Sequence, residues 1–400
     1  MNILFITIAW PPTGERNLYT DLMDEFVLHG HSVYVAGTQN NEKPVKTWPE
    51  KENGIEVLRI NSGSIRKSSY FRKAVSLFTL GRRFLNAINR CLNDINFDLI
   101  IAPTPPITLS RLLKKLKKKY DSPFYLLLKD IWPQGSVDLK VIRKYGIPWI
   151  YLRSHEARLY RTADYIGCMS PLGVQYILSK NKFIPEKKVE VCSNSIRPVK
   201  DVPEIKSDTI RAKYNIPQDA CVFIFSGNLG IGHGLHFLAE AIELLSDYSK
   251  AFFVIGGSGT HYQYLRNRFA EFSPQNALLY SWLPREDFEQ ILATSDVGLI
   301  LLYRYTSPQF PSRLLSYLEY SKPALCAVNE ATDIGTTVEK SSCGRSVIHG
   351  DLEGFINAIK YLSENSDERR KMGENGRKLL MNNYTVAHSY EIIMSHFRSS

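Results

Sequence analysis

Residues 306–327, with the sequence TSPQFPSRLLSYLEYSKPALCA, combine the residue types that bind anions at the start of a helix. Pro311 and Ser312 predict a helix that begins near Arg313, and the turn at Lys322-Pro323 leads into an apolar strand. The first backbone N–H groups of a helix have no partner within the helix and attract negative charge. The Arg313 guanidinium adds a planar set of donors that suits phosphate oxygens. An ordinary helix start is the alternative interpretation of this segment.

Glycines follow apolar strands at three further places: Gly14 follows the first strand, and two glycine-rich loops follow strands in the second half. The loop at 226–234, SGNLGIGHG, follows one strand and opens a helix, and the loop at 256–259, GGSG, follows the next strand. Glycines at the carboxyl end of a strand let the backbone approach a phosphate closely. The glycines that we expect to do so are Gly14, Gly227, Gly256, Gly257 and Gly259. For Gly14 a plain turn explains the residue equally well, and no GxGxxG fingerprint follows the first strand, which argues against a dehydrogenase.

Lys129 and Asp130 close an apolar strand in the segment LKDIWP. Carboxylates at a strand end act as bases or hydroxyl anchors, and Asp is also a common turn former; we favour the functional interpretation for Asp130. No Asp-x-Asp pair occurs, so we expect no metal-chelated nucleotide and no metal site. The six cysteines are scattered without zinc spacing, and we expect them to be reduced core residues.

Apolar runs alternate with amphipathic helices along the chain, which is typical of parallel α/β layers. Strands are expected at 2–8, 32–36, 97–102, 124–128, 165–169, 189–192, 221–225, 252–255, 277–280, 297–302 and 324–328. Four hundred residues are enough for two domains. The proline- and charge-rich stretch 196–208 predicts the linker between them. We therefore expect domains at 1–197 and 198–384, with a last helix at about 385–400 that crosses back to the first.

Positive charge is concentrated in the first half, where residues 1–200 hold 31 Lys and Arg against 17 Asp and Glu. Between Glu56 and Asp94 there is no acidic residue, and aromatic residues are interleaved with the cations. Such a basic amphipathic segment suits anionic lipid headgroups. Nucleic acid is disfavoured, because no DNA- or RNA-binding motif accompanies the charge. The cations that we expect at a membrane or acceptor surface are Arg66, Lys67, Arg72, Lys73, Arg82 and Arg83.

A second basic run at 114–119, KKLKKK, ends an expected helix, where cations also complement the helix dipole. No apolar run approaches the length of a membrane span, and the start of the chain resembles a first strand more than a signal peptide. We therefore expect a cytoplasmic protein.

The order of these motifs resembles family 4 of the retaining glycosyltransferases over nearly the whole chain. The matching second-half elements are the loops at 226–234 and 256–259, Ser295-Asp296, and Pro311-Ser312-Arg313 with Lys322-Pro323. Trp10-Pro11-Pro12 with Gly14 and the LKDIWP segment resemble the subgroup of bacterial capsule, exopolysaccharide and O-antigen gene clusters. The resemblance implies a GT-B fold, that is, two facing Rossmann-like domains with a cleft between them. It places the nucleotide sugar on the C-terminal domain and the acceptor on the N-terminal domain.

The chain departs from the family pattern at several donor-site positions. Asn228 and His233 stand where the family usually has an Arg/Lys pair for the diphosphate, and Pro308 and Ser316 replace a pair of glutamates. Gln309 or backbone groups would then contact the sugar, and Ser316 or Glu319 the ribose. Lys129 stands where a histidine often precedes Asp130. The donor site implied by the resemblance also includes Phe310, Pro311, Ser312 and Arg313.

The resemblance implies metal-independent transfer of a hexosyl or N-acetylhexosaminyl group with retention, without a cofactor. We expect a UDP-sugar donor and a lipid-linked acceptor, such as a polyprenyl diphosphate saccharide, at the inner face of the cytoplasmic membrane, with Lys129 and Asp130 positioning the acceptor. The alternatives are a soluble GT-B enzyme, either a small-molecule transferase or a nucleotide-sugar epimerase, and a non-catalytic protein that binds membranes or nucleic acid.

Overall fold

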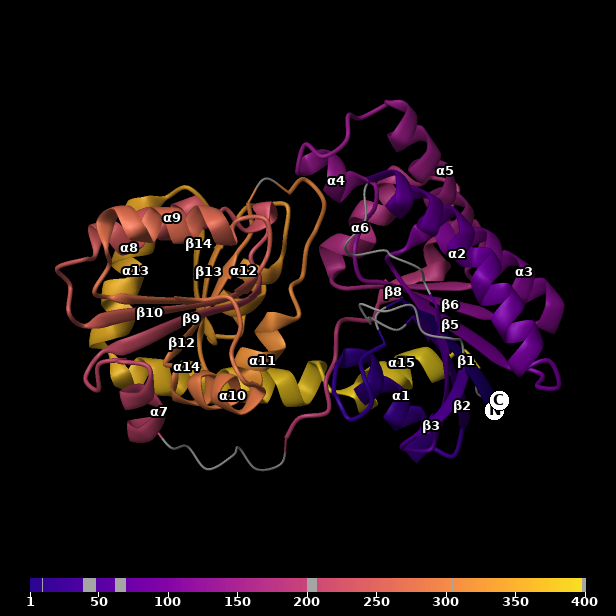
Figure 1. Cartoon of the computed structure of the whole chain (residues 1–400), viewed down its shortest axis with the longest axis horizontal. Helices are drawn as coiled ribbons and strands as arrows, with labels where there is room; N and C mark the ends of the chain where they lie inside the picture. The colour runs from indigo at the N-terminus through magenta and orange to yellow at the C-terminus, as the bar shows by residue number, and fades with distance from the viewer. Residues whose placement is uncertain (9, 39–47, 62–69, 200–206, 304, 398–400) are drawn as a thin grey trace. The chain divides into compact units, whose positions relative to one another are not determined.

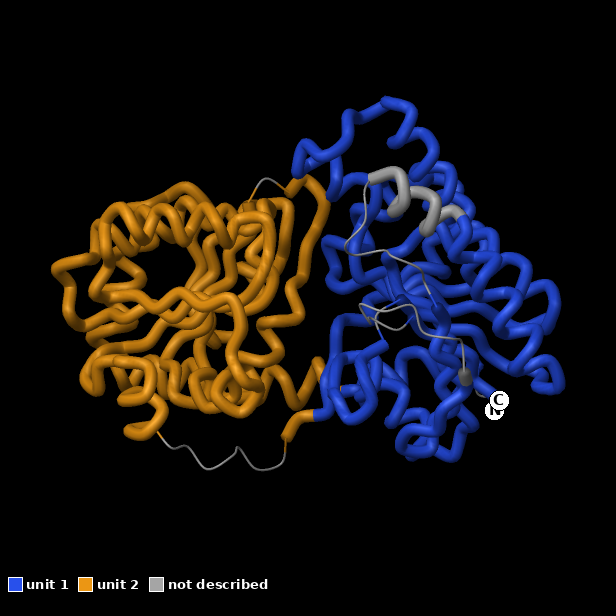
Figure 2. The backbone as a smooth tube through the Cα atoms, viewed as in Figure 1, with its two compact units in different colours: residues 1–197, 386–400 blue, residues 198–385 orange. Residues whose placement is uncertain are grey.

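The computed structural model describes residues 1–8, 10–38, 48–61, 70–199, 207–303 and 305–397. The chain divides into two compact units (Figure 2). Unit 1 consists of residues 1–197 and 386–400, and unit 2 of residues 198–385. The middle of the expected linker lies outside the described residues, as do Arg66 and Lys67.

Unit 1 is built on an eight-stranded sheet with the order β3-β4-β2-β1-β5-β6-β7-β8. All neighbouring strands run parallel except the edge strand β3, which pairs antiparallel with β4. The strands are β1 (Asn2–Thr7), β2 (Ser32–Thr38), β3 (Trp48–Glu52), β4 (Ile55–Ile60), β5 (Leu99–Pro103), β6 (Phe124–Leu128), β7 (Tyr165–Cys168) and β8 (Val189–Val191).

Helices cover both faces of this sheet (Figure 1). One core cluster joins the sheet to α2 (Tyr70–Cys91), α3 (Ser110–Tyr120), α5 (Ile147–Thr162) and α6 (Pro171–Lys180). The opposite cluster joins it to α1 (Leu18–Leu28) and to α15 (Val386–Met394), the last helix of the chain. The short helix α4 (Gln134–Asp138) and two 3-10 turns, Ile107–Leu109 and Glu186–Lys188, complete the unit. Because successive strand residues face opposite sides, β1, β2, β4, β5 and β6 each contribute buried residues to both clusters.

Unit 2 is built on a six-stranded, fully parallel sheet with the order β11-β10-β9-β12-β13-β14. The strands are β9 (Cys221–Asn228), β10 (Ala251–Ser258), β11 (Ala277–Tyr280), β12 (Val297–Leu301), β13 (Ala324–Val328) and β14 (Gly344–Ile348). The helices are α7 (Ser207–Lys213), α8 (Leu235–Leu244), α9 (Tyr262–Phe272), α10 (Arg285–Thr294), α11 (Arg313–Glu319), α12 (Ile334–Lys340), α13 (Leu352–Glu364) and α14 (Ser366–Asn383). A 3-10 turn covers Ile231–His233.

The expected α/β fold class with parallel sheets is confirmed, and each expected strand is present within one to three residues at its ends. Strands β3, β4 and β14 were not predicted. β4 was missed because it carries a charged residue in its core position: Arg59 is buried and its guanidinium pairs with Glu50 and Glu52 on β3. In the part of the chain that the structure describes, no helix is long and apolar enough to cross a membrane.

Candidate functional site

Two loops of unit 2 part at the centre of its sheet. From β9 the chain moves to β10 and β11 on one side, and it then returns to β12 on the other side of β9. The loop after β9 and the loop after β12 therefore diverge at the carboxyl ends of adjacent strands, which is where parallel α/β sheets bind ligands. Both predicted anion-binding segments, the 226–234 loop and the loop that leads into α11, start at this switch point.

Arg313 lies at this switch point and carries a positive charge. It is the first residue of α11, and its guanidinium lies over the ring of Phe225 at 4.1 Å from the ring centroid. Its Nη2 atom lies 3.4 Å from Nε2 of His233, whereas Nη1 is buried without a hydrogen-bond partner among the described residues. Burial lowers the pKa of Arg313, but a guanidinium keeps its charge in proteins. Arg313 is thus a desolvated cation to which no carboxylate of the described residues is paired.

His233 orients this arginine and adds no charge of its own. Its Nδ1 atom lies 2.9 Å from the carbonyl oxygen of Leu301, which fixes the proton on Nδ1 and turns the Nε2 lone pair toward Arg313. Burial, and then the Arg313 charge, lower the pKa of His233 to about 4, so the ring is neutral at physiological pH. In this structure Nε2 of His233 faces Arg313, and direct contact of His233 with a diphosphate stays a prediction.

The predicted glycines are required by packing between the ends of β9 and β10. Gly257 pairs with Gly227 and has a φ of +133°, and a Cβ atom there would lie 1.8 Å from the Gly227 carbonyl oxygen. Tyr280 occupies the space beside Gly256, and the Leu229 backbone that beside Gly259. These contacts explain three of the glycines without a ligand, so a donor-binding role for Gly256, Gly257 and Gly259 stays a prediction.

We expect Gly257→Ala to destabilise unit 2 by several kcal/mol, because the new Cβ both strains a left-handed φ and collides with the adjacent backbone. Gly350 is the matched control: its φ is +107°, and a Cβ there meets nothing within 4 Å. Gly350→Ala should therefore cost only the conformational penalty, about 1–2 kcal/mol. Urea unfolding of both variants measures the difference. Equal costs would mean that the β9–β10 contact relaxes freely.

The remaining residues around α11 differ in how they are held. Ser312 is exposed and makes no side-chain cap, and the Ser316 hydroxyl is half-buried with no hydrogen-bond partner among the described residues. The ring of Phe310 is buried 5.9 Å from that of Tyr384. The Gln309 side-chain amide nitrogen lies 3.4 Å from the Ser307 hydroxyl, and the Gln309 backbone carbonyl oxygen accepts a hydrogen bond from the Thr332 hydroxyl. Pro311 precedes the helix, and Asn228 is exposed at the end of β9.

Glu319 has a structural partner at the other end of α11. Its Oε1 atom accepts the backbone N–H of Val199 at 2.9 Å. Arg377 of α14 binds the carbonyl oxygens of both Glu319 and Val199, at 2.9 and 2.8 Å. Glu319 is buried in this arrangement and holds the first residues of unit 2 against its helices. This internal use argues against Glu319 as the ribose ligand, and of the two residues considered we retain Ser316.

In unit 1, Lys129 and Asp130 directly follow β6. The Thr104 hydroxyl fixes the Asp130 backbone, since it lies 3.2 Å from the Asp130 nitrogen and 3.1 Å from its carbonyl oxygen. Neither the Lys129 amine nor the Asp130 carboxylate makes a hydrogen bond or close ion pair among the described residues. Burial lowers the pKa of Lys129 to about 8 and raises that of Asp130, which the Lys129 charge opposes. Gly14 lies in an exposed turn of the same unit, with a φ of +84° and open space where its Cβ would be.

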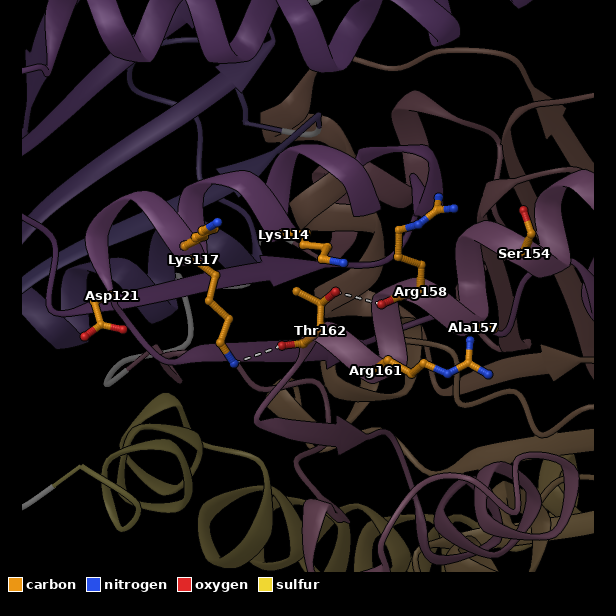
Figure 3. A pocket seen from close by; sticks show the side chains of 9 residues that line it. Lys114, Lys117, Asp121, Ser154, Ala157, Arg158, Arg161 and Thr162 are labelled. Atoms are coloured by element: carbon orange, nitrogen blue, oxygen red, sulfur yellow. Dashed lines mark hydrogen bonds between the residues drawn. The ribbon is translucent and has the colours of Figure 1, made fainter.

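The basic residues of unit 1 are described only in part. Arg72 and Lys73 belong to α2, but their side chains lie outside the description, whereas Arg82 and Arg83 are exposed on the same helix. A cavity of about 650 Å³ lies between α3 and α5 (Figure 3). Within the second basic run, Lys117 is bound by Asp164, at 2.6 Å to Oδ1. The lining residues are Lys114, Lys117, Lys118, Asp121, Ser154, Ala157, Arg158, Arg161 and Thr162.

Three aromatic residues behind the 226–234 loop were not predicted. Besides Tyr280, they are Tyr303 and His349, which fill the space where Gly234 would carry a Cβ. Their rings lie 4.8 Å apart, and burial lowers the pKa of His349 to about 4. These residues come from the end of β11 and from the loops after β12 and β14, so no spacing in the sequence marks them as neighbours.

Residues 206–379, most of unit 2, match the model of the family Glycosyl transferases group 1. Unit 2 is thus similar to these enzymes in sequence. A probable glycosyltransferase, WbjE of Pseudomonas aeruginosa, is 23% identical over 303 residues, which cover 74% of this chain and 72% of that protein.

Solved structures show the same fold over the full length. Sucrose-phosphate synthase from Thermosynechococcus elongatus matches with a TM-score of 0.76 at 14% identity, covering 99% of this chain and 98% of that one. Anabaena HepE in complex with UDP matches with a TM-score of 0.66 at 14% identity, covering 99% of each chain. The fold class is therefore that of the GT-B glycosyltransferases.

Proposed function

We propose that this protein is a retaining glycosyltransferase that uses a nucleotide sugar, namely a UDP-sugar, as its donor. The observation that carries the proposal is the Arg313 guanidinium at the switch point of unit 2, which has no carboxylate partner among the described residues. Desolvating a cation without a partner is costly, and a ligand diphosphate would supply the missing negative charge. The family match of the same unit, and the complex of the structurally similar HepE with UDP, support a nucleotide ligand.

Arg313 would act on the leaving group. When the bond between the anomeric carbon and the phosphate oxygen breaks, negative charge develops on the diphosphate. A donor fixed in place before the reaction stabilises that charge without reorganisation. His233 and Phe225 provide the fixing, since they hold the guanidinium from two sides. The Ser316 hydroxyl on the next turn of α11 is free to bind the ribose.

Retention follows if the acceptor attacks from the side of the leaving group. The acceptor oxygen then bonds to the anomeric carbon as the phosphate departs, and the hydroxyl proton passes to a phosphate oxygen. This route needs no enzyme nucleophile and no metal ion. Lys129 and Asp130 would position the acceptor, the carboxylate binding a sugar hydroxyl and the ammonium binding a phosphate.

We further propose that the acceptor is a saccharide on a lipid diphosphate, used for bacterial surface polysaccharide at the inner face of the cytoplasmic membrane. The excess of cations in residues 1–200 and the exposed Arg82 and Arg83 support an anionic partner for unit 1. Anionic headgroups attract basic residues at about 1 kcal/mol each. Such attraction would bring the protein to a lipid-borne substrate.

Thermal unfolding with UDP, GDP, ADP and CMP, each with and without magnesium, tests the donor site. We expect UDP to raise Tm most, and equally with and without magnesium, because Arg313 supplies the positive charge. At about a hundred times its Kd, a ligand adds ~2.7 kcal/mol to the stability of the folded state. A protein that none of the four nucleotides stabilises would refute the proposal and favour a non-catalytic role.

A further inference from the structure

The loop after α4 and the first turn of α5, together residues 139–150 with the sequence LKVIRKYGIPWI, project from the body of unit 1 (Figure 1). Four of its apolar or aromatic side chains are largely exposed: Val141 at 68%, Tyr145 at 69%, Ile147 at 85% and Ile150 at 56%. Single exposed apolar residues are common on protein surfaces, but four within ten residues form a patch of the kind that binds a protein or a membrane. We call residues 139–150 the apolar projection.

Cations are interleaved with these side chains. Lys140, Arg143 and Lys144 are all exposed, and none makes an ion pair with a carboxylate among the described residues. The chain has no acidic residue between Asp138 and Glu156. An apolar surface edged by unpaired positive charge matches an anionic lipid bilayer, with its apolar interior and negative headgroups. A second protein would need both an apolar and an acidic surface at the same place.

Backbone hydrogen bonds hold the apolar projection in shape. The N–H groups of Val141 and Ile142 both bind the Ser136 carbonyl oxygen, at 2.9 and 3.3 Å. The Gly146 N–H binds the Arg143 carbonyl oxygen at 3.1 Å. The rings of Tyr145 and Trp149 lie 5.0 Å apart, edge to face. The apolar side chains are therefore presented outward by an ordered turn, and they are not buried against unit 1.

The apolar projection emerges at the edge of the sheet where β6 ends. The chain leaves β6 through Lys129 and Asp130, forms α4, and only then returns along α5 to the start of β7. Since β6 and β7 are parallel, the start of α5 must lie on the side of the carboxyl ends of the strands. The projection and the proposed acceptor residues thus share one edge of unit 1.

We infer that residues 139–150 are an interfacial anchor that inserts its apolar side chains into an anionic membrane surface. Tyr145 and Trp149 would lie at the headgroup level, where aromatic side chains are enriched, with Ile147 and Ile150 in the acyl region. The inference rests on the proposed function only for its purpose, which is to bring a lipid-linked acceptor to Lys129 and Asp130. Binding to lipid can be measured without donor or acceptor.

Flotation of the full chain with phosphatidylcholine vesicles, with and without phosphatidylglycerol, tests the anchor. We expect the wild type to bind the anionic vesicles. The double variant Ile147→Glu/Ile150→Glu should have a partition coefficient onto these vesicles that is at least tenfold lower. In Lys140→Gln/Lys144→Gln the partition coefficient should fall about fivefold for each charge removed. High salt should lower the partition coefficient of the wild type by a similar amount. Leu244→Glu is the matched control, because Leu244 is 63% exposed on α8 of unit 2 and should bind as the wild type does.

Tryptophan fluorescence tests the same insertion independently. The chain has five tryptophans, so the contribution of Trp149 is the quenching by brominated acyl chains that the wild type should show and Trp149→Phe should lack. Equal flotation of wild type and Ile147→Glu/Ile150→Glu would overturn the inference. So would self-association without vesicles that this double variant abolishes, because a second copy would then cover the patch. Each variant should keep its UDP-induced rise in Tm, so failure of the anchor is distinguishable from failure of the donor site.

Discussion

Replacing Arg313 by methionine is expected to abolish stabilisation by UDP while leaving the ligand-free protein at least as stable as the wild type. The two effects have the same cause. The guanidinium is desolvated, and its Nη1 atom has no partner among the described residues, so the empty site bears the cost of an unpaired charge. Methionine is long enough to keep contact with the Phe225 ring and carries no charge.

The same variant should lower kcat/KM for the donor by about 10²–10³-fold, the usual effect of removing one donor that stabilises a developing anion. Thermal unfolding with and without UDP, together with initial rates, measures both parts. Arg285→Met is the control, since the Arg285 side chain is 60% exposed on α10 and its ion-pair partner among the described residues is Glu289. A variant that is clearly less stable without ligand, yet responds fully to UDP, would show that Arg313 is a structural residue.

The second large effect is expected in the pH dependence of sugar transfer. Burial lowers the pKa of Lys129 to about 8, so the amine is charged below pH 8 and loses its charge above it. If the ammonium binds the phosphate of the acceptor, kcat/KM should fall about tenfold per pH unit above that value. Lys129→Arg should shift this fall upward by several pH units, because a guanidinium keeps its proton.

Stability should not follow the rate in this range. An unfolded chain holds the Lys129 proton up to about pH 10.4, whereas the folded chain releases it near pH 8, so the contribution of this group to stability rises with pH between the two values.

Asp130 determines how the rate falls at acid pH: its raised pKa should make kcat/KM fall at a higher pH than an ordinary carboxyl would. Asp130→Asn should lose about 10²-fold or more in rate with its UDP response intact. An alkaline limb that persists in Lys129→Arg would refute the assignment.

The α/β architecture could be predicted because buried parallel strands are short continuous apolar runs, as in residues 124–128. β4 escaped prediction because Arg59 interrupts its pattern, and only the pairing with Glu50 and Glu52 makes that residue compatible with burial. The local residue pattern therefore finds strands whose own residues are apolar throughout. It misses a strand that depends on charges supplied by its neighbour.

The candidate site was predictable where helix-start chemistry decides it, as at Arg313. It was not predictable where contacts with residues distant in the sequence determine the hydrogen-bond partner of a side chain. Glu319 is committed to Val199, 120 residues earlier, and His233 is held by Leu301, 68 residues later. The apolar residues at 141–150 resemble core residues in the sequence, and only the structure places them outside.

The return of α15 to unit 1 has a consequence for how the protein is made. Val386, Tyr390, Ile393 and Met394 are buried in the core cluster that also contains α1 and the first strands. Domains of most multidomain chains fold in order as they leave the ribosome. Here the first unit to be synthesised lacks part of its core until residues 386–394 emerge, whereas the residues of unit 2 are complete before them. The part of the sheet of unit 1 that α15 covers therefore stays open to chaperones or to aggregation until α15 has been synthesised.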